Sequence, residues 1–175
     1  MKTIFLVGYM GCGKSSLGRS LAQALGCQFV DLDDYIEQQE QTTIASLFSL
    51  RGEEAFRLLE RAALEKLAMA QDTVVATGGG AACYADNIDL MNRQGISIYL
   101  RVSAQELQHR LSVPKHQAKR PLISQLPADE LLSHIQTMLQ QREPYYLKSQ
   151  YIVDCTAAPK AENLQNILNT LLVAK

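Results

Sequence analysis

The chain has 175 residues, the size of one ordinary domain, so it can bury a substantial core without disulfides or structural metals. Its residues are 47% hydrophobic and 20% charged, and the formal net charge is -1. This composition is that of a globular protein, and it lacks the strong excess of basic residues that is typical of nucleic-acid-binding proteins. We therefore expect one folding unit whose partners are small molecules, with no nucleic acid among them.

The cysteines and the amino-terminal segment favour a protein of the reducing cytosol. The four cysteines form no C-x-x-C pair and the three histidines complete no zinc-ligand spacing, so we interpret the cysteines as free thiols. The apolar run within residues 1–7 is too short for a membrane span, and it leads into a glycine loop instead of a cleavage site. We expect a cytoplasmic protein without a membrane partner.

Short apolar strands and helical patterns alternate along the first half of the chain. Residues 4–7 form a continuous apolar run that Gly8 ends, as expected of a central parallel strand. Helical spacing follows from residue 14 to residue 25, and Gly26 suits the left-handed residue that closes a helix. The pattern then predicts a strand at 29–30, helices at 35–50 and 53–70, and a buried strand at 73–77.

The second half continues this alternation around one irregular segment. The pattern predicts a helix at 85–93, a strand at 96–100, and a helix at 103–111 with Ser103 as N-cap and Glu106 at the capping-box position. Residues 112–126 hold two prolines and no sustained period, so we expect a loop there, followed by a helix at 128–143, a strand at 151–153 and a helix at 161–172. Alternating strands and helices imply a mostly parallel sheet covered on both faces, with ligands at the carboxyl ends of its strands.

The segment from Gly8 to Ser15 fits the pattern G-x-x-x-x-G-K-[ST] and lies between a predicted strand and a predicted helix. Glycines let the backbone wrap round the β-phosphate, and the helix N-terminus supplies positive potential. Lys14 reaches the β- and γ-phosphate oxygens in this motif, and the Ser15 hydroxyl can ligate magnesium. The motif predicts a nucleoside triphosphate site, but alone it does not distinguish a kinase from a GTPase or a motor.

Three carboxylates follow the second predicted strand. Asp31 and Asp33 are two residues apart, so at a strand end they project to the same side and can share a site. One carboxylate can lie near the magnesium shell while the other accepts a hydrogen bond from the hydroxyl to be phosphorylated. The alternative role for such a residue is to cap the helix that enters at Tyr35, and we assign this role to Asp34.

The run Thr77-Gly78-Gly79-Gly80 comes directly after a buried strand, at the carboxyl edge of the sheet. Consecutive glycines cost conformational entropy, and close approach of the backbone to a ligand is the usual reason for them. A plain flexible turn is the alternative interpretation.

Arg57 and Glu60 are three residues apart on a predicted helix and therefore share a face. They can form a solvated ion pair. Alternatively, Glu60 orients the Arg57 guanidinium so that it forks onto a substrate carboxylate. The spacing leaves both interpretations open.

The irregular segment carries several cations, namely Lys115, Lys119 and Arg120, and a later Arg142 precedes Glu143-Pro144-Tyr145. Such loops are often solvated, but in a phosphate-transfer enzyme a mobile basic flap can cover the γ-phosphate and exclude water. We assign that contact to Arg120.

Taken together in their order along the chain, these segments resemble the shikimate kinase family over nearly the whole sequence. The most telling pieces are the glycine loop, F-V-D-L-D from Phe29, F-R-L-L-E from Phe56, T-G-G-G from Thr77, R-P-L from Arg120 and R-E-P-Y from Arg142. The combination of F-R-x-x-E and T-G-G-G separates this chain from gluconate kinases and nucleoside monophosphate kinases.

The resemblance implies a P-loop three-layer α/β sandwich of the nucleoside-monophosphate-kinase-like fold, with a five-stranded parallel sheet and a flexible lid. It implies a single domain over residues 1–175, an acceptor-binding region at about 33–61 and a lid at about 112–126. The implied reaction is transfer of the ATP γ-phosphate to the 3-hydroxyl of shikimate, which gives shikimate 3-phosphate and ADP with Mg²⁺ as cofactor. We expect a monomer.

The resemblance also implies roles for single residues. The ATP cradle would comprise Gly11, Cys12, Gly13, Lys14, Ser15 and Ser16, with Arg110 near the adenine and Arg120 closing from the lid as a catalytic residue. Ser15 would bind magnesium, and Asp31 would support the water shell of the metal. Asp33 would contact the substrate hydroxyls and act as base, while Arg57 and Arg142 would hold the carboxylate and Gly79 and Gly80 would supply backbone contacts.

The chain departs from the family pattern at three places, one of which is the segment from Arg110 to Arg120, which is longer than in many relatives. Gln41 stands where the family commonly has glycine, and the loop 154–159 lacks an arginine that often stacks near adenine, although Pro159 can still pack on the ring. Two other functions stay open: a kinase for another small polyol acid such as gluconate, and a nucleotide-switched binding protein with no phosphoryl acceptor.

Overall fold

The computed structural model describes residues 1–113, 127 and 129–173. The expected lid at 112–126 therefore lies almost wholly outside the described residues, together with Arg120. The elements in chain order are β1 Ile4–Val7, α1 Lys14–Leu25, β2 Gln28–Asp31, α2 Leu32–Glu40, α3 Ile44–Ala68, β3 Thr73–Ala76, η1 Ala81–Cys83, α4 Asn87–Gln94, β4 Ile96–Arg101, α5 Ala104–Leu111, α8 Leu131–Tyr146, β5 Tyr151–Asp154 and α9 Lys160–Val173.

The five strands form one parallel sheet in the order β2-β3-β1-β4-β5, as the alternating pattern predicts. The central strand β1 is buried along its whole length, which explains why its sequence is continuously apolar. The strand order places the carboxyl ends of β1, β2 and β3 side by side. The glycine loop, the aspartates and the T-G-G-G run follow these three ends and so come to one edge of the sheet.

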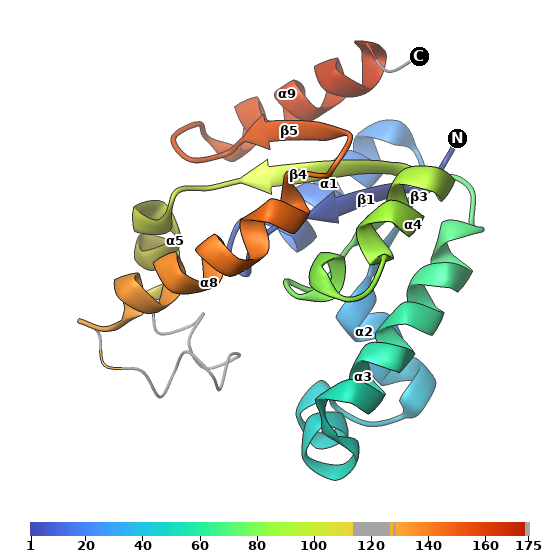
Figure 1. Cartoon of the computed structure of the whole chain (residues 1–175). Helices are drawn as coiled ribbons and strands as arrows, with labels where there is room; N and C mark the ends of the chain where they lie inside the picture. The colour runs from blue at the N-terminus through green and yellow to red at the C-terminus, as the bar shows by residue number, and fades with distance from the viewer. Residues whose placement is uncertain (114–126, 128, 174–175) are drawn as a thin grey trace.

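Helices cover both faces of the sheet (Figure 1). The chain moves from β1 to β2 in one direction across the sheet and returns in the other direction for every later strand. Because such crossovers are right-handed, α1 lies on one face, and α3, α4 and α8 lie on the other. The last helix, α9, returns to pack against α1. Figure 1 shows α4 and α8 on the near side of the sheet.

The region after β2 differs from the prediction in its helix boundaries. The expected helix at 35–50 begins earlier, at Leu32, because β2 ends directly at Asp31 with no loop between strand and helix. Asp31 is the N-cap, and its Oδ1 accepts a hydrogen bond from the backbone N–H of Asp33 at 3.2 Å. The assignment of the cap to Asp34 is therefore wrong, and Asp34 lies in the first turn.

The same stretch contains a second helix start that the sequence pattern did not predict. Gln41 ends α2 in the left-handed conformation, with φ 51°, which explains why glycine is common at this position in the family. Thr43 caps α3, and its hydroxyl accepts from the Ser46 N–H. The expected break between the two predicted helices is confirmed at Gly52, where φ is 80° and the helical geometry is interrupted.

Two further helix boundaries differ from the prediction. The helix expected at 128–143 runs from Leu131 to Tyr146 and contains Pro144 in its last turn, where the missing N–H removes a single helical hydrogen bond. The helix expected at 85–93 begins at Asn87 because the chain first forms the short helix η1. Within the described part of the chain, no helix is both long and apolar enough to cross a membrane.

Candidate active site

The loop between β1 and α1 has the backbone geometry that its sequence predicts. Gly8, Gly11 and Gly13 have φ values of 144°, 83° and 102°, which side-chain-bearing residues rarely adopt. Gly13 directly precedes α1, so the first N–H groups of the helix point into the loop. The loop forms one wall of a cleft of about 700 Å³, which we call the first cleft.

Lys14 and Ser15 both line this cleft and have defined partners. The buried Lys14 ammonium donates to the carbonyl oxygens of Gly8 at 2.7 Å and Tyr9 at 2.9 Å. The Ser15 hydroxyl donates to Asp31 Oδ2 at 2.6 Å. The cationic group and the hydroxyl therefore lie within one loop that also offers backbone N–H groups, which suits a polyphosphate and its metal ion.

Asp33 lies in the first cleft with Asp31, as the spacing of the two residues predicts. Burial and the neighbouring Asp31 charge raise the pKa of Asp33 to about 6, against the opposing effect of Lys14. A carboxyl group with this pKa is ionised at neutral pH but binds a proton more readily than an ordinary aspartate. It is therefore suited to accept a proton from a hydroxyl.

The glycines at 78–80 leave room for charged side chains of the protein. A Cβ atom at Gly78 would lie 2.8 Å from Glu60 Oε1 and 3.0 Å from Asp33 Oδ1. A Cβ atom at Gly80 would lie 2.6 Å from Arg57 Nη2. None of the three glycines has a positive φ, so close approach rather than an unusual turn explains Gly78 and Gly80, whereas a Cβ atom at Gly79 would lie 3.4 Å from the nearest atom, the backbone nitrogen of Met10. The run is packed against side chains, and the interpretation as a plain flexible turn is wrong.

Arg57 and Glu60 form a partly buried ion pair. The distance from Arg57 Nη1 to Glu60 Oε2 is 2.7 Å, and the exposed fractions of the two side chains are 15% and 1%. Glu53 binds the other terminal nitrogen of Arg57 at 3.2 Å. Burial raises the pKa of Glu60 despite the nearby Arg57 charge. Glu60 is buried and orients the guanidinium, as the second interpretation of this spacing requires, while the contact of Arg57 with a substrate carboxylate stays a prediction.

Arg142 comes from α8 to the same place. Its Nη1 lies 3.6 Å from the position of a Cβ atom at Gly79, and its guanidinium carbon lies 5.9 Å from the centre of the Tyr9 ring. Arg57 and Arg142 both line a second cleft of about 610 Å³, together with Gly80 and Cys83. Gly79 lines the first cleft and Gly80 lines the second, so both clefts border the glycine run.

Two tyrosines that the sequence reasoning missed hold α8 in this position. The Tyr146 hydroxyl donates to the Gly79 carbonyl oxygen at 2.5 Å, and Tyr146 is completely buried. The Tyr99 hydroxyl donates to Glu143 Oε1 at 3.1 Å. Tyr146 follows Arg142 by one helical turn, and this spacing is the only sequence signal that could have indicated its role.

Arg110 connects the first cleft to the loop after β5. Its guanidinium donates to the carbonyl oxygens of Cys155 at 2.9 Å and Cys12 at 3.5 Å, and its Nε binds Glu106 at 2.7 Å. The N-cap role of Ser103 is confirmed. The Glu106 side chain, however, binds Arg110, which lies in the last turn of the same helix.

Comparisons with known proteins agree on one family. The sequence model of the shikimate kinase family matches residues 10–172. A shikimate kinase of Parabacteroides distasonis is 41% identical over 172 residues, which is 98% of each chain. The chain belongs to the shikimate kinase family.

Solved structures support this assignment and the fold. The crystal structure of shikimate kinase from Bacteroides thetaiotaomicron has a TM-score of 0.91 at 39% identity and covers 97% of this chain and 98% of its own. Shikimate kinase from Acinetobacter baumannii, solved in complex with shikimate, has a TM-score of 0.88 at 33% identity, with 100% and 95% of the two chains covered. The kinase described here is thus an ATP-dependent enzyme with the five-stranded α/β fold that its sequence predicts.

The residues that the family resemblance implicates fall into two groups in the structure. One group lines the first cleft and comprises Gly11, Gly13, Lys14, Ser15, Ser16, Asp31, Asp33, Gly79 and Arg110. The other lines the second cleft and comprises Arg57, Gly80 and Arg142. Cys12 is buried beneath the loop, with its thiol 3.7 Å from the Lys14 ammonium.

Proposed function

We propose that this chain transfers the γ-phosphate of ATP to the 3-hydroxyl of shikimate and releases shikimate 3-phosphate and ADP. The observation that carries the proposal is that both clefts border the glycine run, with Asp33 lining the first cleft and the two arginines lining the second. A small acid with several hydroxyl groups can place its carboxylate on the arginines and a hydroxyl near Asp33. The other end of the first cleft is then open to a nucleotide.

ATP is assigned to the first cleft. The N–H groups of residues 11–16 and the Lys14 ammonium bind the phosphates, and Arg110 lies towards the adenine. Lys14 exchanges the carbonyl oxygens of Gly8 and Tyr9 for phosphate oxygens when the nucleotide enters. Arg120 closes onto the phosphates from the lid, and this assignment rests on the resemblance alone.

The first cleft also has oxygen ligands that suit Mg²⁺. Ser15 and Asp31 present a hydroxyl and a carboxylate next to each other, and both are hard oxygen ligands. The described residues contain no cluster of three or more metal-ligating side chains, which fits a metal held mainly by phosphates and water. Bound Mg²⁺ neutralises the charge of the β- and γ-phosphate oxygens. Ser15 would bind it directly and Asp31 through water.

The acceptor is assigned to the second cleft and the glycine run. Arg57 and Arg142 fork onto the shikimate carboxylate, and the backbone of Gly79 and Gly80 contacts the ring substituents. The 3-hydroxyl oxygen attacks the γ-phosphorus, and the bond from that phosphorus to the β,γ-bridging oxygen breaks. The hydroxyl proton passes to Asp33, which is suited to accept it by its raised pKa.

We further propose that the enzyme works as a cytoplasmic monomer of one domain. We assign the acceptor-binding region to about residues 33–61. The four cysteines are free thiols, which is typical of a reducing compartment.

A coupled ADP-release assay with a panel of hydroxy acids tests the function. We expect ADP release to depend on shikimate, and Lys14→Met to remove most of it while the melting temperature stays unchanged. A preference for gluconate or another polyol acid would mean that the acceptor is that acid and not shikimate. Slow ATP hydrolysis that no metabolite accelerates would indicate a nucleotide-switched binding protein. Activity of Lys14→Met near that of the wild type would contradict the assignment of the nucleotide site.

A further inference from the structure

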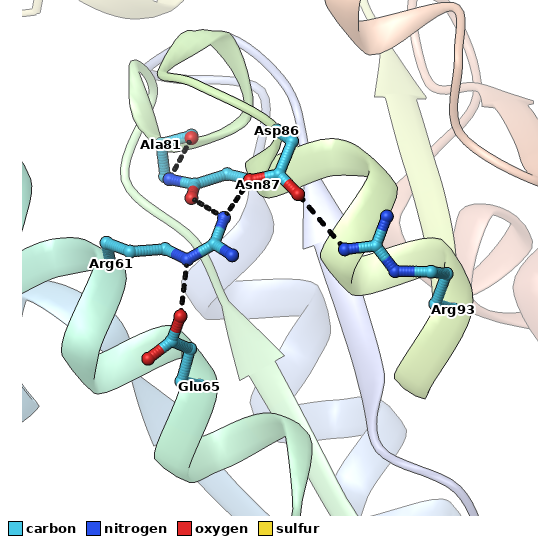
Figure 2. A network of polar contacts seen from close by, with 6 residues as sticks. All are labelled: Arg61, Glu65, Ala81, Asp86, Asn87 and Arg93. Carbon is cyan, nitrogen blue, oxygen red and sulfur yellow. Dashed lines mark hydrogen bonds and ion pairs between the residues drawn. The ribbon is translucent and has the colours of Figure 1, made fainter.

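A polar network lies next to the glycine run, outside the two clefts (Figure 2). Arg61 on α3 donates through Nη1 to Asp86 Oδ1 at 2.5 Å and to Asn87 Oδ1 at 2.9 Å. Glu65 holds the Nε of Arg61 at 2.8 Å, and Arg93 binds the other oxygen of Asp86 at 3.0 Å. The network therefore joins α3 to the start of α4.

Asn87 is the buried centre of this network. It is 0% exposed, and its Nδ2 donates to the carbonyl oxygen of Ala81 at 2.8 Å while its Oδ1 accepts from Arg61. A buried amide must satisfy both ends, so these two hydrogen bonds fix the orientation of the side chain. Asn87 thus links Arg61 to the backbone at Ala81 (Figure 2).

Ala81 directly follows Gly80 and begins η1. Its N–H donates to the Gly78 carbonyl oxygen at 3.1 Å, and the Cys83 N–H donates to the Gly80 carbonyl oxygen at 3.0 Å. The glycine run and η1 therefore form one closed turn. A side chain that holds Ala81 also holds the backbone of the run.

Helix α3 contacts this turn at two points that are one helical turn apart. Arg57 packs directly against Gly80, and Arg61 reaches Ala81 through Asn87. Because Arg57 and Arg61 share a helical face, the distance from the Arg57 guanidinium to the glycine backbone depends on how Arg61 and Asn87 hold the turn.

We propose that Arg61 and Asn87 are positioning residues for the acceptor. Arg61 and Asn87 hold the glycine run at the distance from Arg57 at which the glycine backbone and the Arg57 guanidinium can bind the same small carboxylic acid. This inference rests on the proposed acceptor site, because the distance between Arg57 and Gly80 matters only if both contact the acceptor. Asp86 and Arg93 contribute less, because their side chains are 50% and 58% exposed and such ion pairs are screened by water.

Two substitutions test the proposal. Asn87→Asp keeps the oxygen that accepts the hydrogen bond from Arg61, but it places a second carboxylate oxygen, in place of the amide N–H, against the Ala81 carbonyl oxygen. Arg61→Gln removes the guanidinium that donates to Asn87. We expect each to raise the KM for shikimate about fivefold, the effect of one lost hydrogen bond, with the KM for ATP unchanged and kcat within about twofold of wild type at saturating shikimate. Arg93→Gln is the matched control in the same network and should leave both KM values unchanged.

A purely structural role would give a different result. It would lower the melting temperature and the active fraction of the enzyme without separating the two KM values. The Arg61 side chain is 23% exposed while Asn87 is completely buried, so we expect Arg61→Gln to give a folded enzyme even if Asn87→Asp does not. An unchanged KM for shikimate in Arg61→Gln, or an equal rise in the KM for ATP, would overturn the proposal.

Arg57→Ala separates this inference from the proposed function. If Arg57→Ala raises the KM for shikimate but Arg61→Gln does not, the positioning role fails and the acceptor site stands. If Arg57→Ala leaves that KM unchanged, the acceptor site itself is misplaced, and the positioning proposal fails with it.

Discussion

Asp33 combines a position at the carboxyl edge of the sheet with a pKa of about 6. If it accepts the hydroxyl proton, the rate should fall as the pH decreases through about 6, since the protonated carboxyl cannot act as base. Asp33→Asn should lower kcat by about a hundredfold or more and remove this acidic limb from the pH profile. A loss smaller than threefold, or an acidic limb that persists unchanged in Asp33→Asn, would remove Asp33 from the chemistry.

The same pKa predicts an effect on stability. The folded state binds a proton at Asp33 more tightly than the unfolded chain does, so this group favours folding at low pH and opposes it as the pH rises towards and above 6. Asp33→Asn removes the charge that burial and Asp31 disfavour. We therefore expect a higher melting temperature than wild type at pH 7.5 and a smaller difference at about pH 4, measured by thermal unfolding at both values. A lower melting temperature at pH 7.5 would show that the Asp33 carboxylate stabilises the fold.

The glycine run is the element on which the acceptor site depends. At Gly80 a methyl group would meet the terminal nitrogens of Arg57, which are the far end of a long side chain and not part of the core. Gly80→Ala should therefore displace the guanidinium more than it disturbs the fold. We expect the KM for shikimate to rise about tenfold, as for a lost charge-assisted contact, with little change in melting temperature.

A double variant checks that the methyl group of Gly80→Ala acts by displacing the Arg57 guanidinium. In an Arg57→Ala background the obstructing atoms are absent, so adding Gly80→Ala should change the KM for shikimate very little. Additive effects of the two substitutions would mean that Gly80 contributes by its own backbone, independently of Arg57.

Most elements were predictable because their signals are local. The apolar run of β1, the P-loop pattern and the spacing of Arg57 and Glu60 each lie within a few residues of sequence. Tyr146 and Asn87 were not predictable, because each binds a single backbone carbonyl, that of Gly79 and that of Ala81, and no sequence pattern marks such a contact. The cap at Asp31 was missed for another reason: three aspartates close together all fit an N-cap, and only the end of β2 decides between them.

At the scale of the whole molecule, the sheet order brings together groups that are far apart in sequence. The segments that follow β1, β2 and β3 lie at one edge of the sheet, and α3 and α8 contribute one arginine each to the second cleft. Tyr146 fixes α8 to Gly79, while Asn87 fixes α3 to Ala81 through Arg61. The glycine run is therefore held from two sides, and the two arginines can act as one clamp only while both attachments persist.

The clamp makes a prediction that a generic kinase site does not. If Arg57 and Arg142 both bind the shikimate carboxylate, changing either to Ala should weaken shikimate binding by about 1.5 to 3 kcal/mol, the range for hydrogen bonds to charged groups, while ATP affinity stays the same. An analogue with a carboxamide in place of the carboxylate should bind the wild type poorly. It should lose little further affinity in Arg142→Ala, because the interaction that this arginine makes is already absent. Calorimetry with both ligands and both proteins measures this coupling directly. Equal losses for shikimate and the carboxamide, or a fall in ATP affinity instead, would place Arg142 outside the acceptor site.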